Sequence, residues 1–243
     1  MSSYETAAKI LDRLLSGDRA NIFAPLQKRA QLVRLGNRYA ISALGSGFVY
    51  IVARGVVCVE STVHPGVHAV TALLYEGDVF IPELQPPLPE LTLTTQRPCE
   101  FWKLTLTALA EESERNSQLR KALFLLPQMR NARSQLHIAA MSGLNSEERI
   151  AAVLIEIGAH IGMQAGGAIS FDLPLSRNNI ADYLALNPDT VSRILSSLVN
   201  DGIIERRGRF QVTIRDWQAL VAKCPLSDAI IRLHGAGKPL LTG

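Results

Sequence analysis

The sequence predicts an α+β protein built from a region of short strands, a long helix and a C-terminal winged helix-turn-helix. Residues 31–106 carry short runs rich in Val, Ile, Thr, Tyr and Phe that are separated by Gly and Pro. Between residues 105 and 142 these strand signals vanish, and apolar residues recur every three or four positions. From residue 169 onward, two helix patterns with capping residues precede two further short strands.

Length, charge and cysteine usage narrow the class of protein. The 243 residues leave room for one large or two modest domains, and the net charge of +3 is too small by itself to indicate a nucleic-acid partner. Cys58, Cys99 and Cys224 lie far apart and form no CxxC pair, which fits a reducing cytoplasm. Residues 1–15 have the pattern of an amphipathic helix and not of a secretory signal. No uncharged apolar stretch is long enough for a membrane span, so we expect a cytoplasmic protein without a membrane partner.

The N-terminal strands are predicted at residues 48–53, 56–60 and 91–95. The Arg54–Gly55 pair between the first two is a tight-turn signal, so these strands are expected to form a hairpin. Residues 82–89 contain four prolines and are expected to form a loop, because proline cannot donate to a strand ladder. Several short strands at this spacing favour a sandwich, a roll or a barrel.

A long amphipathic helix is expected next. Its apolar stripe comprises Leu119, Leu123, Leu126, Met129, Leu136 and Ala140, with Arg133 in the same register. Pro127 is expected to kink or split this helix, and Gly143 to end it. An exposed helix with such a stripe usually needs a partner, and a two-fold pairing of two copies supplies one. A further helix is expected to open at residues 146–149 and to continue through the apolar run 150–161.

Two short helices with about three residues between them form the predicted helix-turn-helix. Ser176 is a good N-cap for the first, which should end near Ala185. Asn187 caps the second, and Pro188 occupies its first position, where a missing N–H costs nothing. This second helix should run to about Asn200. Its inward face is Val191, Ile194, Leu195 and Leu198, and its outward face is Asp189, Thr190, Ser192, Arg193 and Ser196.

The chain then turns at Asp201–Gly202 into two strands, residues 203–205 and 210–214, joined around the basic stretch 206–209. This is the pattern of a β-wing whose arginines suit a phosphate backbone. Ordinary core packing with a solvated arginine turn would produce parts of the same pattern. The combination of two capped helices, a polar outward face and a basic hairpin favours DNA binding, with Arg193 able to contact a guanine and Asp189 a cytosine.

The segments LPLSRNNIADYL (173–184), DTVSR (189–193) and LVNDGII (198–204) resemble the Crp/Fnr superfamily of bacterial regulators, and in particular its Fnr and FixK branch. NSEERIA (145–151) resembles the segment that this family places after its dimerisation helix. The resemblance is strong over residues 145–220. Over residues 31–106 it is architectural only, where the family has a β-roll of the cyclic-nucleotide-binding type.

The resemblance implies a β-roll domain with an N-terminal helix at residues 1–106, a dimerisation helix at 107–143 and a winged helix-turn-helix domain at 144–243. It implies a homodimer that regulates transcription, binds an inverted repeat and contacts RNA polymerase. Ser192 and Arg193 fall at the family's base-contacting positions, whereas Asp189 stands where the family usually has glutamate. The candidate DNA-binding residues are Ser176, Arg177, Asp189, Thr190, Ser192, Arg193, Arg207 and Arg209.

Residues 77–84 stand where relatives that bind cyclic AMP have a phosphate-binding cassette. Ile81–Pro82 replaces the glycine of that cassette, and Pro82 removes a donor from a site that needs amide hydrogens. Arg97 is followed by Pro98 and not by the small residues of the cassette. We therefore expect no cyclic-nucleotide dependence and no cofactor. Three scattered cysteines do not supply the four clustered ligands that an iron–sulfur centre needs.

Two other classes of protein remain as alternatives. In a haem- or metal-sensing regulator, Cys58, His64 and His68 are the candidate ligands, and the two histidines could share one strand face. In a cupin-like β-barrel, the site would comprise His64, His68 and Glu76, but the tight His-x-His pair is missing. No set of catalytic residues is indicated, since Ser46 lacks the first glycine of a nucleophile elbow. Cys224 is expected to be more exposed than Cys58, with an unassigned redox role.

Overall fold

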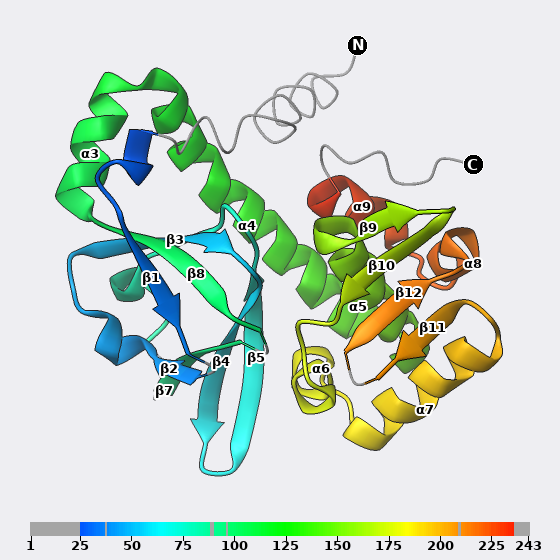
Figure 1. Cartoon of the computed structure of the whole chain (residues 1–243). Coiled ribbons are helices and arrows are strands. Elements are labelled where there is room, and N and C mark those ends of the chain that lie inside the picture. The colour runs from blue at the N-terminus through cyan, green and yellow to red at the C-terminus, as the bar shows by residue number, and fades with distance from the viewer. Residues whose placement is uncertain (1–24, 37, 88–89, 96, 209, 236–243) are drawn as a thin grey trace. The chain divides into compact units, whose positions relative to one another are not determined.

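The computed structural model describes residues 25–36, 38–87, 90–95, 97–208 and 210–235 (Figure 1). The helix expected within residues 1–15 lies outside these ranges. The chain divides into two compact units, residues 1–131 and 132–243, which we describe separately. The domain boundaries expected from the sequence remain a prediction. Among the described residues, no helix combines the length and hydropathy that crossing a bilayer requires.

The first unit contains two four-stranded antiparallel sheets. One has the order β1-β8-β3-β6, from Gln31–Leu35, Cys99–Thr105, Phe48–Arg54 and Val79–Phe80. The other has the order β2-β7-β4-β5, from Arg38–Ala40, Glu90–Thr94, Val57–His64 and Val67–Leu74. Two 3-10 turns, η1 (Ile41–Leu44) and η2 (Pro82–Leu84), connect strands. The prediction of a β-roll is confirmed.

Strand β3 is buried on both faces because its alternate side chains enter two cores. Tyr50 and Val52 join the core between the sheets, together with Val57, Val59 and Phe101. Val49 and Ile51 instead pack in a second core with residues of the helices that follow β8. The near-continuous apolar run of β3 therefore reflects burial on two sides.

The prediction of a hairpin around Arg54–Gly55 is wrong. Strand β3 pairs with β6 and β8, whereas β4 pairs with β5 and β7 in the other sheet. Gly55 has a φ of 99°, so it provides a sharp turn, but that turn carries the chain from one sheet to the other. The proline-rich loop also contains one turn of helix, η2, which Pro82 opens at its first position.

Helices α3 (Leu106–Arg115) and α4 (Ser117–Gly143) follow β8. The interruption lies at Asn116, and α4 continues through Pro127, so the helix is not split where we expected. Leu119, Met129 and Ala140 of the predicted stripe are buried within the chain itself. The apolar side chains that α4 exposes most are Phe124 and Ile138, which are 72% and 63% exposed.

The second unit contains α5 (Ser146–Ile161), β9 (Met163–Ala165), β10 (Ala168–Asp172), α6 (Arg177–Leu184), α7 (Pro188–Asn200), β11 (Ile204–Arg207), β12 (Gln211–Ile214), α8 (Trp217–Ala222) and α9 (Ser227–His234). Its antiparallel sheet has the order β11-β12-β10-β9. Helix α5 lies at the centre of this unit, and every residue from Ile150 to Ala159 is buried. A capping box between Asn145 and Glu148 starts this helix.

Helix α5 ends in close contact with the sheet at Gly162. A Cβ at Gly162 would lie 2.3 Å from the carbonyl oxygen of Gly158 and 2.4 Å from Cγ2 of Ile169. The backbone of this junction can approach β10 only because the residue is glycine.

Candidate nucleic-acid interface

The two helices of the predicted helix-turn-helix have the caps that the sequence indicated (Figure 1, yellow to orange). The hydroxyl of Ser176 accepts a hydrogen bond from the amide of Asn179 at 3.1 Å, which starts α6. The side-chain oxygen of Asn187 accepts from the amide of Asp189 at 2.8 Å, and Pro188 is the first residue of α7. Each cap satisfies an amide that has no partner within its helix, so both starts are fixed locally.

The turn between α6 and α7 contains a strained residue. Ala185 has φ 51° and ψ 48°, and no other non-glycine residue in the described ranges has a positive φ. An L-residue in this left-handed conformation costs about 1–2 kcal/mol. The conformation ends α6 abruptly, and the amide of Leu186 then donates to the carbonyl of Ala181 at 2.9 Å. The angle between the two helices is therefore held at an energetic cost.

Helix α7 has one buried and one exposed face, as expected. The side chains of Val191, Ile194, Leu195 and Leu198 are buried. On the opposite face Asp189, Arg193 and Ser196 are exposed, and Thr190 and Ser192 are half-buried. Arg193 forms no hydrogen bond or ion pair with any residue that the structure describes, so its guanidinium is available to an outside partner.

Arg177 and Ser192 come from different helices and lie together. The Arg177 guanidinium donates to the Ser192 hydroxyl at 3.1 Å, and that hydroxyl donates to the carbonyl of Pro188 at 3.0 Å. Both residues are therefore held near the N-terminal end of α7. Ser176 is different, because its hydroxyl caps α6 and also contacts the Asn179 side chain.

The wing is formed by β11 and β12, which pair from Ile204–Ile214 to Arg207–Gln211. Arg206 and Arg207 are exposed, while Arg209 lies outside the described residues. The guanidinium of Arg207 contacts the carboxylate of Glu205 at 2.8 Å. Glu205 also pairs with Arg215, and hydrogen bonds from Arg215 and then Arg207 lower the pKa of its carboxyl. The wing is thus basic but partly neutralised by Glu205.

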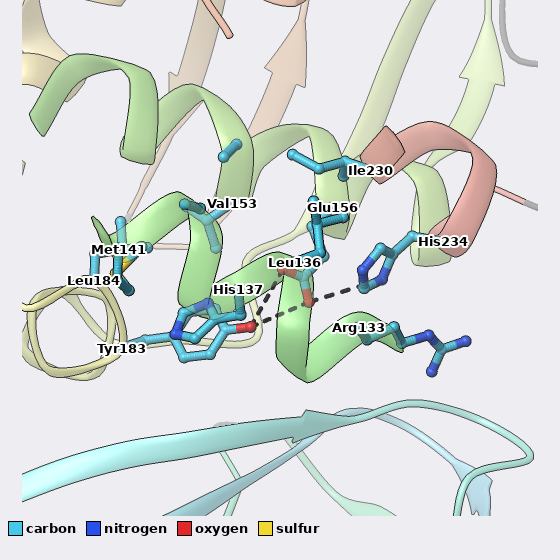
Figure 2. Close-up of a pocket in the computed structure, with 12 residues that line it drawn as sticks. Arg133, Leu136, His137, Met141, Val153, Glu156, Tyr183, Leu184, Ile230 and His234 are labelled. Carbon is cyan, nitrogen blue, oxygen red and sulfur yellow. Dashed lines mark hydrogen bonds and ion pairs between the residues drawn. The ribbon is translucent and has the colours of Figure 1, made fainter. Parts of the chain in front are cut away.

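A buried polar cluster lies where α6 packs against α4, α5 and α9, and the sequence did not indicate it (Figure 2). The Tyr183 hydroxyl of α6 donates to the Glu156 carboxylate of α5, with distances of 3.3 and 3.5 Å to its two oxygens. Nδ1 of His234 in α9 lies 3.9 Å from that carboxylate and 2.9 Å from Nε2 of His160. The ring of His137 in α4 stacks on Tyr183 with the ring centroids 4.1 Å apart.

Burial lowers the pKa of two histidines of this cluster, His234 and His137. It lowers the pKa of His234 well below the usual 6.5, and the positive charges of Arg133 and His137 act in the same direction. Burial also lowers the pKa of His137, against a hydrogen bond to the Tyr183 backbone that raises it. Glu156, a carboxylate within the apolar run of α5, is the one sequence signal from which such a cluster could have been predicted.

The segment at the place of a phosphate cassette uses its backbone amides internally. The amides of Gly77 and Asp78 donate to the carbonyls of Val52 and Tyr75, each at 2.9 Å. The Glu83 carboxylate accepts from the amide of Gly47. These contacts fit a segment that does not cradle phosphate. The expectation that the chain needs no cyclic nucleotide remains a prediction.

The candidate metal ligands Cys58, His64 and His68 do not form a group of three in the described part of the chain. His64 ends β4 and His68 lies in the paired strand β5, where His64 is opposite Val67 and His68 is opposite Thr62, and both histidines are exposed. Cys58 is buried, and burial raises the pKa of its thiol to about 12. Glu76 lies in the loop after β5. Within the described ranges, no three His, Cys, Asp or Glu side chains are grouped to hold a metal ion.

Cys224 is buried to nearly the same extent as Cys58, so the more exposed position that we expected for it is not found. Cys224 is 2% exposed, since it packs at the end of α8, and burial raises the pKa of its thiol. A buried thiol of raised pKa is a poor nucleophile, so neither cysteine has the surroundings of a redox sensor.

Comparison with known proteins identifies relatives of both units. Residues 148–223 match the Crp-like helix-turn-helix domain. The anaerobic regulatory protein of Pasteurella multocida is 27% identical over 201 residues, which cover 81% of this chain and 70% of that protein. The nitrogen fixation regulation protein FixK of Rhizobium meliloti is 35% identical over 122 residues, 50% of this chain and 56% of that protein.

Among solved structures, FixK2 from Bradyrhizobium japonicum superposes with a TM-score of 0.68 at 25% identity. The match covers 80% of this chain and 97% of FixK2. These similarities agree with the capped helix-turn-helix, the wing and the β-roll. Residues 148–223 therefore form a Crp-like helix-turn-helix domain, and the chain is similar to transcription regulators of the Fnr and FixK type.

Proposed function

We propose that the chain binds a palindromic DNA site as a homodimer in the cytoplasm, with α7 of each copy in the major groove of one half-site. The single observation that carries this proposal is the face of α7 that presents Asp189, Ser192 and Arg193 while the opposite face is buried. The N-terminal residues of a recognition helix are the ones that reach base edges.

Each polar residue on this face has a distinct task. Arg193, exposed and without a partner among the described residues, donates to O6 and N7 of a guanine. Asp189 accepts from a cytosine amino group, and its side chain is one methylene shorter than the glutamate usual in the family. Ser192 and Thr190 contact base edges or phosphates. Ser192 is oriented for this by its hydrogen bonds with Arg177 and Pro188.

Phosphate contacts surround these base contacts. Ser176 fixes the first turn of α6, whose free amides and adjacent Arg177 face a phosphate. The wing contributes Arg207 and Arg209 to the backbone of the DNA. Because Arg207 is paired with Glu205, it must exchange that carboxylate for a phosphate on binding. We therefore expect the wing to contribute less to affinity than its count of arginines indicates.

The homodimer forms along α4. Phe124 and Ile138 are large exposed apolar side chains fourteen residues apart, a spacing of two heptads that returns to the same side of a coiled-coil helix. Pairing the helix with that of a second copy removes these side chains from water. A two-fold dimer presents two recognition helices, which read half-sites about 34 Å apart along the duplex. Contact with RNA polymerase is part of the same proposal.

Selection from a random pool of DNA duplexes tests this function, using the purified full-length chain with no added ligand. Enrichment of a palindrome whose half-sites lie about ten base pairs apart supports the proposal. A wild-type protein that enriches no sequence contradicts it. Arg193→Ala and a control, Arg232→Ala, enter the same selection. Arg232 is an exposed residue of α9, so only Arg193→Ala should lose the guanine of the half-site.

A further inference from the structure

Arg149 joins the ends of two helices, α4 and α6, that are not consecutive in the chain. It lies in the first turn of α5 and is half-buried. Its Nε donates to the carbonyl of Leu144 at 2.9 Å, and its Nη2 donates to the carbonyl of Met141 at 2.7 Å. Its Nη1 donates to the carbonyl of Leu184 at 3.1 Å. One guanidinium therefore binds the end of α4 and the end of α6.

Two of these carbonyls, those of Met141 and Leu184, are ones that a helix leaves without partners. Met141 lies in the last turn of α4, Leu144 follows its end, and Leu184 is the last residue of α6. The C-terminal end of a helix carries partial negative charge, so a cation placed between two such ends is stabilised by both. The planar guanidinium reaches three acceptors in one arrangement, which a lysine ammonium cannot reproduce.

The hydrogen bond from Arg149 to Leu184 lies next to the turn that determines the direction of α7, the proposed recognition helix. Leu184 directly precedes Ala185, the strained residue at which the chain turns from α6 into α7. A second contact between the same two helices lies one residue earlier, where His137 of α4 stacks on Tyr183 of α6. All of these residues belong to the second unit, residues 132–243. The end of α4 and the start of the turn are thus held together at two points.

We propose that Arg149 is a positioning residue for DNA recognition, which fixes the orientation of the helix-turn-helix relative to the end of the dimerisation helix. This inference rests on the proposed function, because the orientation matters only if α4 pairs two copies and α7 reads DNA. Arg149 itself does not touch the DNA. Its effect is on the spacing and phase at which the two recognition helices of a dimer are presented.

The experiment compares full-length wild type, Arg149→Met, Arg149→Lys and the matched control Arg232→Met. Each binds three duplexes: the selected palindrome, and versions with one base pair added or removed between the half-sites. One base pair rotates a half-site by about 34° about the duplex axis, which a rigid dimer does not accommodate. Binding is measured well below the unfolding temperature of each variant.

Wild type and Arg232→Met should prefer the original spacing by about tenfold or more, the scale of losing one specific contact. In Arg149→Met and Arg149→Lys that preference should fall to about threefold or less, which corresponds to about 0.7 kcal/mol of discrimination or less. A variant that is only less stable would weaken binding to all three duplexes by the same factor. The ratio between duplexes therefore separates positioning from stability.

Arg149→Lys keeps the positive charge, so it is the variant in which the spacing ratio is measured if Arg149→Met does not fold. A folded Arg149→Lys or Arg149→Met protein that keeps the wild-type spacing ratio overturns the inference while the proposed function stands. A wild-type protein that binds no palindrome overturns both. Loss of the spacing preference in the Arg149 variants alone supports the inference.

Discussion

Replacing Ala185 with glycine should stabilise the second unit. Ala185 has φ 51° and ψ 48°, and the left-handed region costs an L-residue about 1–2 kcal/mol. Glycine removes that cost, but it also enlarges the unfolded ensemble, which offsets about 0.5–1 kcal/mol. The net gain should be about 0.5–1 kcal/mol. For a unit of this size the midpoint of thermal unfolding should rise by about 2–6 °C.

Ala139→Gly is the matched control for that substitution. Ala139 is an exposed residue inside α4, where glycine should lower the free energy of unfolding by about 0.5–1 kcal/mol. Thermal unfolding of both variants is followed by circular dichroism at one fixed protein concentration, because a dimer's midpoint depends on concentration. The two midpoints should move in opposite directions. A fall in the midpoint of Ala185→Gly, equal to that of Ala139→Gly, would refute the claim that the turn is strained.

Three further predictions follow from the packing. The folded-state pKa of His234 is lowered by burial and nearby cations, so below about pH 6.5 the unfolded chain binds a proton that the folded chain does not. Stability to urea should therefore fall as the pH drops from 7 to 5, and less steeply in His234→Gln; equal slopes would contradict this. Gly162→Ala should lower the unfolding midpoint, because its Cβ would lie 2.4 Å from Ile169, and an unchanged midpoint would be contrary evidence. The double substitution of Phe124 and Ile138 by glutamate should shift the mass measured by light scattering from dimer to monomer, with an unchanged dimer as the contrary result.

The helix-turn-helix was predictable because its signals are local. Ser176, Asn187 and Pro188 act on the backbone within three residues of themselves, and α7 begins and ends where the sequence indicated. The inward face of α7 also follows directly from a helical period. The sequence did not reveal that the turn is strained. Alanine is not a residue type that indicates a positive φ, so the conformation of Ala185 could not be predicted from its identity.

The errors concern contacts between segments far apart in the chain. The Arg54–Gly55 signal indicated a turn correctly, but which strands pair across it is determined by β6, β7 and β8. In α4 the apolar stripe was evident, yet the sequence did not show that Leu119, Met129 and Ala140 are buried by their own chain. Glu156 and His234 are 78 residues apart (234 − 156), so no local pattern joins them.

The measurement that tests the central claim most directly is the ratio of affinity for the selected palindrome to affinity for a scrambled duplex, in wild type and in Arg193→Ala. Loss of a bidentate arginine–guanine contact costs about 1–3 kcal/mol at each half-site. The account predicts that Arg193→Ala loses most of this ratio while its salt-dependent binding to scrambled DNA is retained. An unchanged ratio in a folded Arg193→Ala protein would contradict the assignment of α7 as the helix that reads the DNA sequence.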